Sequence, residues 1–168
     1  MLSCGDLSAS YLTFLVTMGR ARLLYVHGNH DEGYVNQPPE GCECIEDKLV
    51  TVNGLRILGL GGSAMYSGGP YQYTEAQMRR RLRRAGWAVR RAGGVDIVVT
   101  HAPPRGCGDL DDPAHRGFEA LIPFVEKYKP AYLVHGHIHM NYVRGLPRSR
   151  VLGDTTVINA WERFELEI

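Results

Sequence analysis

Residues 131–139, Ala131-Tyr-Leu-Val-His-Gly-His-Ile-His139, run from an apolar segment of strand length directly into a turn that carries histidines. Short aliphatic segments bounded by Gly or Pro are typical of buried strands. Two more lie earlier in the chain, Arg22-Leu-Leu-Tyr-Val26 and Val95-Asp-Ile-Val-Val-Thr100. Polar residues follow each of them, and loops at the carboxyl ends of strands are where α/β sheets bind ligands. The stretch therefore predicts an α/β protein with a polar site at its strand ends.

Helical patterns lie between these strands. Ser8 to Met18 predicts a helix that ends at Gly19, and Ala120 to Lys129 predicts another. Thr74-Glu-Ala-Gln77 has the sequence of a capping box, and apolar residues then recur every three or four positions as far as a Gly-Gly pair. The alternation of strands and helices predicts a layered α/β architecture.

Two antiparallel strand pairs add to the expected sheet. Asn53-Gly54 is a strong hairpin signal and separates Lys48–Val52 from Leu55–Leu60. Near the C-terminus, Thr155–Asn159 and the strictly alternating Arg163–Ile168 are expected to form the second pair. Parallel and antiparallel neighbours together predict a mixed sheet.

The size and charge of the chain exclude several classes of protein. Its 168 residues, 44% of them hydrophobic, suffice for one domain, which we expect to span residues 1–168. A net charge of +1 gives no overall attraction for nucleic acid or for an anionic membrane. The apolar segments are far shorter than the roughly 20 residues that cross a bilayer. We expect no membrane partner, and the sequence leaves the oligomeric state open.

The start of the chain and its cysteines indicate the compartment. Met1-Leu-Ser-Cys-Gly5 lacks the charged and apolar regions of an export signal. A domain of this size needs no disulfides, so we expect reduced thiols at Cys4, Cys42, Cys44 and Cys107. These features predict a cytoplasmic protein.

Four strand-end segments carry residues of the kinds that bind metals. They are Gly5-Asp6, Gly28-Asn-His-Asp31, the segment that begins at His101, and residues 135–139. Alternate residues of an extended segment point the same way, so both imidazoles of Gly136-His-Ile-His139 can enter one cavity. One Asp, one Asn and several imidazoles, without a thiol, suit Mn, Fe, Zn or Co. The segments predict a metal centre where the loops meet.

The same segments, taken in order as Gly5-Asp6, Gly28-Asn-His-Asp31, Thr100-His101 and Gly136-His-Ile-His139, resemble the motifs of the calcineurin-like metallophosphoesterases. The likeness runs from the first residues to about Asn159. It implies a four-layer fold in which two mixed β-sheets pack as a sandwich flanked by helices. It also implies metal-dependent hydrolysis of a phosphate monoester or diester with two divalent ions, drawn from Mn, Fe, Zn, Co and Ni, with Mn favoured.

The resemblance assigns roles to single residues. Asp6 resembles the carboxylate that bridges the two metals, and the other ligands of one ion are Asn29, His101 and His137. His139 resembles a ligand of the second ion. His30 resembles the proton donor to the leaving alcohol, with Asp31 orienting it. A hydroxide that bridges the metals would attack phosphorus directly, in one step.

Two loops beside the expected site are candidates for a lid over a small phosphorylated substrate. Residues 63–74 are rich in Gly and Tyr, and residues 105–116 include Arg105 and Arg116. Because a guanidinium matches phosphate oxygens, we expect these two arginines to bind the substrate. Solvated loops are the alternative interpretation.

The first motif of the family, Asp-x-His, does not occur in this sequence. In the family it lies on a strand well before Gly-Asp, and the residues ahead of Asp6 are too few to hold it. We therefore expect the second ion to be weakly held. We also expect the chain to be an internal piece of a longer gene product that lacks the first strand and helix, with a genuinely truncated protein as the alternative.

Two other functions are compatible with the sequence. The first is a binding or scaffold protein on the same fold, with catalysis lost together with the first motif. The second is a nuclease that uses the arginine-rich helix of residues 79–91, although a solvated helix face is the favoured interpretation of these arginines. Dependence on a divalent metal separates the enzyme from the scaffold, and salt-sensitive binding of nucleic acid tests the nuclease.

Overall fold

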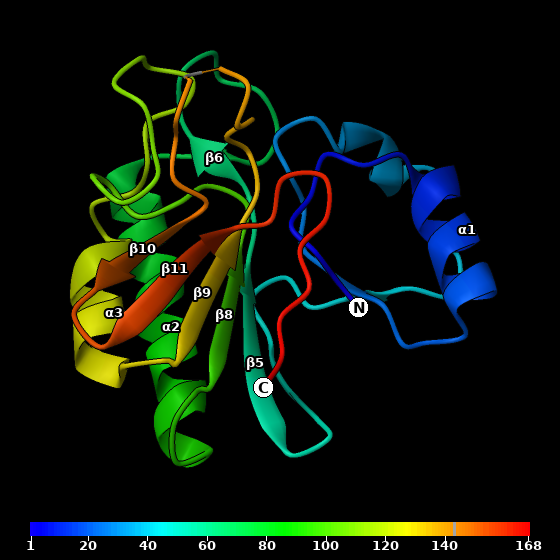
Figure 1. The fold of residues 1–168 in the computed structure, drawn as a ribbon, viewed down its shortest axis with the longest axis horizontal. Helices are drawn as coiled ribbons and strands as arrows, with labels where there is room; N and C mark the ends of the chain where they lie inside the picture. The colour runs from blue at the N-terminus through cyan, green and yellow to red at the C-terminus, as the bar shows by residue number, and fades with distance from the viewer. Residues whose placement is uncertain (143) are drawn as a thin grey trace.

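The chain folds into four layers, which are visible in Figure 1 in the computed structural model of residues 1–142 and 144–168. Helices α2 (Glu75–Arg91) and α3 (Leu121–Tyr128) cover one face of a six-stranded sheet. A three-stranded sheet packs against the opposite face, and α1 (Ala9–Gly19) lies on its outer side. This mixed α/β arrangement confirms the fold class predicted from the sequence.

The six-stranded sheet has the strand order β10-β11-β9-β8-β5-β4. Its strands are β4 (Leu49–Val52), β5 (Leu55–Leu60), β8 (Ile97–Thr100), β9 (Tyr132–His135), β10 (Ser149–Leu152) and β11 (Thr155–Asn159). The four central strands are parallel, and an antiparallel strand closes each edge. The predicted mixed sheet is therefore confirmed, as is the hairpin at Asn53-Gly54.

The smaller sheets consist of very short strands. The three-stranded sheet joins β1 (Leu2–Ser3), β2 (Leu24–Tyr25) and β3 (Glu43–Cys44), and all its pairs are parallel. A parallel pair, β6 (Ser63–Ala64) and β7 (Gln72–Tyr73), frames the Gly- and Tyr-rich loop. A 3-10 helix, η1 (Glu32–Val35), follows the Gly28-Asn-His-Asp31 segment.

The helices begin where their caps predict. The Ser8 hydroxyl accepts a hydrogen bond from the backbone N–H of Tyr11 at the start of α1. At α2, Thr74 and Gln77 exchange both hydrogen bonds of a capping box. Apolar residues spaced three or four apart on α2 are buried against the six-stranded sheet, as the periodicity predicts: Met78, Leu82, Ala85 and Val89. Among the described residues, no helix is long and apolar enough to span a bilayer.

The predicted strand at Arg163–Ile168 is wrong. These residues have no regular secondary structure, and β11 pairs instead with β10 across the Gly153-Asp154 turn. The Nη1 atom of Arg148 lies 3.1 Å from the carbonyl oxygen of Asn159 and 3.2 Å from that of Trp161. The Arg148 side chain thus binds the carbonyl of the last residue of β11 and that of Trp161, while the Gly153-Asp154 turn gives β11 a neighbour on the other side in sequence.

Candidate metal centre

The predicted ligands follow four parallel strands. Asp6 follows β1, Asn29 follows β2, His101 follows β8, and His137 follows β9. Two glycines allow the first two loops to touch. A Cβ atom on Gly28 would lie 2.0 Å from Oδ1 of Asp6, and one on Gly5 would lie 2.2 Å from the Gly28 nitrogen. Both positions therefore exclude any side chain.

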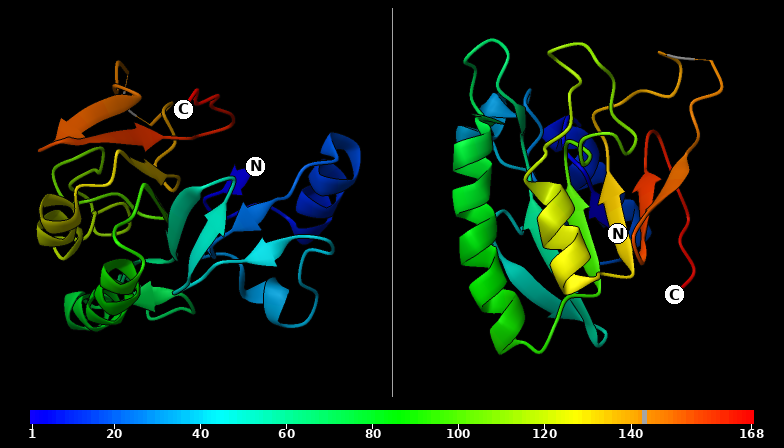
Figure 2. Two further views of the ribbon diagram at one scale, coloured as in Figure 1. Left: turned by 90° about the horizontal axis from the view of Figure 1, so that it is seen from below. Right: turned by 90° about the vertical axis from the view of Figure 1, so that its left-hand side faces the viewer.

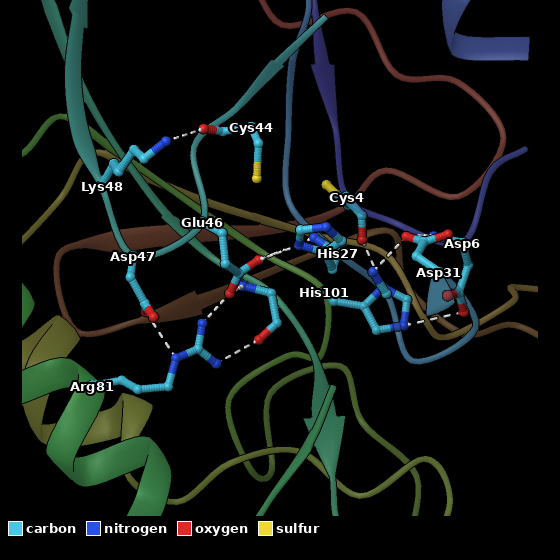
Figure 3. Close-up of polar contacts among 12 residues, drawn as sticks. Cys4, Asp6, His27, Asp31, Cys44, Glu46, Asp47, Lys48, Arg81 and His101 are labelled. Atoms are coloured by element: carbon cyan, nitrogen blue, oxygen red, sulfur yellow. Dashed lines mark hydrogen bonds and ion pairs between the residues drawn. The ribbon is translucent and has the colours of Figure 1, made fainter. Parts of the chain in front are cut away.

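Asp6, His101 and His137 form a compact cluster whose potential ligand atoms all lie within 4.8 Å of one another. Nε2 of His101 lies 3.3 Å from Oδ2 of Asp6 and 3.0 Å from Oδ1 of Asn29. Figure 3 shows His101 reaching toward Asp6. The structure thus brings together the four side chains expected to hold one ion.

The hydrogen bonds around His101 turn ligand atoms toward the centre of this cluster. Its Nδ1 atom lies 2.6 Å from the Cys4 carbonyl oxygen, which can only accept, so Nδ1 carries a ring proton. Nδ2 of Asn29 donates to the Tyr66 hydroxyl at 3.2 Å, which turns Oδ1 of Asn29 toward His101. Nε2 of His101 therefore points at two oxygen atoms, and in the neutral ring it presents them with a lone pair.

A cation satisfies this arrangement. His101 is 0% exposed, so water does not reach its ring. Acceptors that face one another in such a site are costly unless a proton or a metal cation lies between them. A carboxylate, an amide oxygen and two imidazoles are the donor set of a borderline-to-hard divalent metal. The residues present fit such an ion.

The charge states of Asp6 and His137 also suit a metal. Burial by itself would raise the pKa of the Asp6 carboxyl, but contacts with His101 and His30 hold this pKa below its usual value. Burial lowers the pKa of His137 to about 3, so its ring is neutral near pH 7. Nε2 of His137 donates to the Ala114 carbonyl at 2.7 Å, which leaves the Nδ1 lone pair available.

The backbone at two of these residues is strained. Asp6 has φ 60° and His137 has φ 63°, both in the left-handed region. Residues other than glycine enter that region at a cost of about 1–3 kcal/mol, and such residues cluster at functional sites. The fold therefore holds two of the candidate ligands in a conformation that their own preferences oppose.

His30 and Asp31 differ in exposure and in contacts. His30 is exposed, and its backbone N–H donates to Oδ1 of Asp6 at 2.9 Å. It lines a cavity of about 640 Å³ together with Asp6 and Tyr34. Asp31 is buried, and its Oδ2 accepts from the backbone N–H groups of Gly28 at 2.7 Å and Asp6 at 2.9 Å. Asp31 thus links the Asp6 loop to the Gly28 loop. The hydrogen bonds that it accepts come from these backbone groups and not from the His30 ring.

Three other predicted site residues lie outside the compact cluster. His139 is exposed, and its ring stacks on Tyr142 with ring centroids 4.8 Å apart. Arg105 donates to Oδ2 of Asp109 at 2.6 Å and to Oδ1 of Asp111 at 2.9 Å, so carboxylates of its own loop occupy its guanidinium. Arg116 is exposed.

A second buried polar cluster supports the Gly28-Asn-His-Asp31 loop from behind, as Figure 3 shows. Oε2 of Glu46 accepts from the backbone N–H of His27 at 3.1 Å and faces its Nδ1 at 3.3 Å. Oε1 accepts from the Gly61 N–H at 2.9 Å and from the Arg81 guanidinium. Arg81, which is 8% exposed, also donates to Asp47 at 2.8 Å and to the Gly61 carbonyl at 2.8 Å.

Burial lowers the pKa of His27, but hydrogen bonds to Cys44 and Glu46 outweigh that effect and raise this pKa to about 9.

Sequence reasoning missed several residues that shape the site. Tyr66 orients Asn29, the Cys4 carbonyl fixes the His101 tautomer, and the Ala114 carbonyl does the same for His137. Tyr66 lies in a loop already marked by its Gly and Tyr content, which was the available signal. The carbonyl groups of Cys4 and Ala114 could not be predicted in this way, because every residue type has a backbone carbonyl.

Comparison with known proteins identifies the family of the chain. The profile of the family described as calcineurin-like phosphoesterase matches residues 1–141. Two Caenorhabditis elegans proteins are similar to the chain in sequence. The UPF0046 protein K07C11.7 is 27% identical over 82% of this chain and 50% of its own length. The UPF0046 protein C25E10.12 is 27% identical over 94% of this chain and 63% of its own length. The chain thus spans about half to two-thirds of the length of these relatives.

A solved structure shares the fold. The crystal structure of TT1561 of Thermus thermophilus superposes with a TM-score of 0.62 at 15% sequence identity, covering 91% of this chain and 68% of that one. At this identity the likeness concerns the fold alone. The family match covers most of the chain and includes Asp6, Asn29, His101 and His137. The chain belongs to the calcineurin-like phosphoesterases.

Proposed function

We propose that this chain hydrolyses a phosphate monoester or diester in a small phosphorylated substrate, using divalent metal held by Asp6, Asn29, His101 and His137. The observation that carries the proposal is the convergence of an Asp6 carboxylate oxygen, the Asn29 amide oxygen and Nε2 of His101 on one point, with His137 beside them. We propose Mn²⁺ as the preferred ion and a second, more weakly held ion near His139.

Different residues of the chain would bind the metal, donate the proton and position the proton donor. A bound divalent ion supplies a Lewis acid that polarises a phosphoryl oxygen and generates a nucleophile from water at neutral pH. Asp6 and Asn29 would provide oxygen ligands, while His101 and the neutral ring of His137 would provide nitrogen ligands. His30 is exposed and lines the cavity together with Asp6, and its ring would give a proton to the departing alcohol. Asp31 holds the loop that presents His30.

The burial of Cys4 argues against a covalent route through the nearest thiol. Burial raises the pKa of Cys4 to about 12, so this thiol is not a thiolate near neutral pH. Direct attack on phosphorus is the route that we propose. The four cysteines are free thiols, which supports the further proposal that the protein works in the reducing cytoplasm.

The test compares two phosphate esters with Mn²⁺ present, one with a nitrophenyl leaving group and one with an alkyl leaving group. We expect His30→Ala to lower turnover of the alkyl ester by about 10² to 10⁴-fold and that of the nitrophenyl ester far less, because nitrophenolate scarcely needs a proton. Equal losses on both esters would remove His30 from the acid role. A wild-type chain that binds Mn²⁺ tightly and hydrolyses neither ester would instead support the scaffold function.

A further inference from the structure

A groove of about 520 Å³ runs between α2 and α3 on the outer helical layer of the molecule. The right-hand view of Figure 2 shows these two helices side by side in front of the sheet. Leu82 of α2 and Pro123 and Phe124 of α3 are among its lining residues, and they give it an apolar floor. The groove shares no residue with the cluster of Asp6, Asn29, His101 and His137, so a binding role for it is independent of the proposed function.

The rim of the groove is positively charged. Arg79, Arg83 and Arg90 line it from α2, and Lys127 lines it from α3. The three arginines share one face of α2, because they are separated by whole turns of the helix. Among the described residues that line the groove, none is acidic. Arg79 has a distant partner in Glu75 at 3.7 Å, and ion pairs within the described part of the chain involve neither Arg83, Arg90 nor Lys127.

Trp87 stands between these cations. Its side chain is 69% exposed, and the Arg90 guanidinium lies 5.2 Å from its ring centroid. Large aromatic side chains left in water next to a groove are characteristic of interaction surfaces, where Trp and Arg carry a large share of the binding energy. The groove therefore combines an apolar floor, a cationic rim and an exposed aromatic anchor.

We propose that the α2–α3 groove binds an acidic amphipathic helix of a partner protein. The apolar face of such a helix would contact the exposed Ala76 and Pro123, and its Asp and Glu side chains would pair with Arg83, Arg90 and Lys127. Charge complementarity selects this occupant, because four cations converge on a groove without acidic residues. Trp87 would pack over the bound helix and lose its exposure to water.

The floor favours a peptide over single-stranded nucleic acid. Bases bind such proteins by stacking on open aromatic faces. Phe124 is only 6% exposed, so its ring offers no face to a base, and Trp87 provides a single platform. Aliphatic side chains of a helix match the apolar floor, whereas a polyanion would use only the rim.

The test uses a labelled helical peptide of about 18 residues with Leu on one face and Glu on the other, titrated into the whole chain at about 0.15 M salt. We expect saturable binding that weakens at least about tenfold in Arg83→Glu/Arg90→Glu and in Trp87→Ala. The matched control is Arg80→Glu/Arg84→Glu, because these arginines are exposed on the same helix but do not line the groove. This variant has the same net charge as the groove variant and should change the affinity by less than about threefold.

Four outcomes would overturn the proposal: no measurable binding of the peptide to the wild-type chain, equal losses in the two charge-reversed variants, unchanged binding of a peptide whose Leu residues are replaced by Ser, and tighter binding of an oligothymidylate than of the peptide. The last outcome would assign the groove to nucleic acid. Circular dichroism of each variant checks that α2 is intact. A Trp87→Phe variant that retains most of the affinity would support the packing role of the ring.

Discussion

The molecule holds two partly buried polar clusters within one small region, and they balance their charges in opposite ways. Around Glu46, positive and negative groups alternate, and Arg81 and His27 meet carboxylate oxygens directly. Around His101, the ring nitrogen Nε2 faces the oxygens of Asp6 and Asn29, and none of the ion pairs among the described residues brings an arginine or a lysine to them. The first cluster contains its own permanent cation, whereas the second needs a proton or a metal ion at Nε2. The contrast separates a structural network from a ligand site using hydrogen-bond donors and acceptors alone.

A substitution in the Glu46 cluster should lower the free energy of unfolding. We expect Glu46→Gln to destabilise the chain by about 3–5 kcal/mol, because it leaves the buried guanidinium of Arg81 without its main counter-charge. Urea melts with and without Mn²⁺ measure the loss. The control is Asp154→Asn, which removes a pair with Lys129 on the exposed surface and should cost at most about 1 kcal/mol. Equal losses in both variants would contradict the contrast between the clusters.

A substitution in the His101 cluster should instead weaken metal binding. We expect Asp6→Asn to weaken Mn²⁺ binding by about 100-fold or more, because the charged oxygen ligand becomes a neutral amide. The metal-free variant should be at least as stable as the wild type, since the new amide N–H group can donate to the lone pair on Nε2 of His101. Calorimetric titration and melts in chelator measure the two effects. A destabilised metal-free variant would show that Asp6 is already satisfied without a cation.

His135 provides a buried imidazole that belongs to neither cluster. Burial lowers its pKa to about 4, so the folded state keeps it neutral while the unfolded state binds a proton below about pH 6.5. Because the unfolded state then holds more protons, stability is full above pH 6.5 and falls as the pH decreases toward 4. The loss amounts to about 2 kcal/mol between pH 8 and pH 5. His137 acts in the same direction in the metal-free chain.

The measurement is a series of urea melts in chelator across this pH range, with His135→Asn as the comparison. We expect the variant to have a shallower pH slope than the wild type, since the remaining slope comes from other groups. An unchanged slope would mean that His135 does not contribute to the acid sensitivity.

The smallest effect should come from Tyr66, which acts on the metal cluster through Asn29. We expect Tyr66→Phe to weaken Mn²⁺ binding by about tenfold or less, because water can take over the hydrogen bond to Nδ2 of Asn29 at this partly exposed position. Tyr142→Phe is a suitable control, since Tyr142 contacts His139 by ring stacking and lies outside the cluster. Equal affinities in the wild type and Tyr66→Phe would mean that Asn29 needs no orienting partner.

Features encoded locally could be predicted from the sequence. The start of a helix at Ser8, the cap at Thr74 and the turn at Asn53-Gly54 depend on residues a few positions apart, and all three are confirmed. The meeting of the strand-end loops followed from strand order and from the family motifs. The orientation of Asn29 depends on Tyr66, which is 37 positions away. Contacts of that kind arise from tertiary packing, so local patterns could not predict them. The extent of the domain, residues 1–168, stays a prediction.

The left-handed backbone of Asp6 and His137 affects how metal binding can be lost during evolution. In a lineage that still needs the metal, selection keeps an aspartate and a histidine where glycine would relax the chain. Once the need disappears, substitution by Gly at either position would relieve the backbone and remove a ligand in a single step. Loss of the metal in this family should therefore be fast and hard to reverse, and homologues with glycine at either position can be recognised as its outcome.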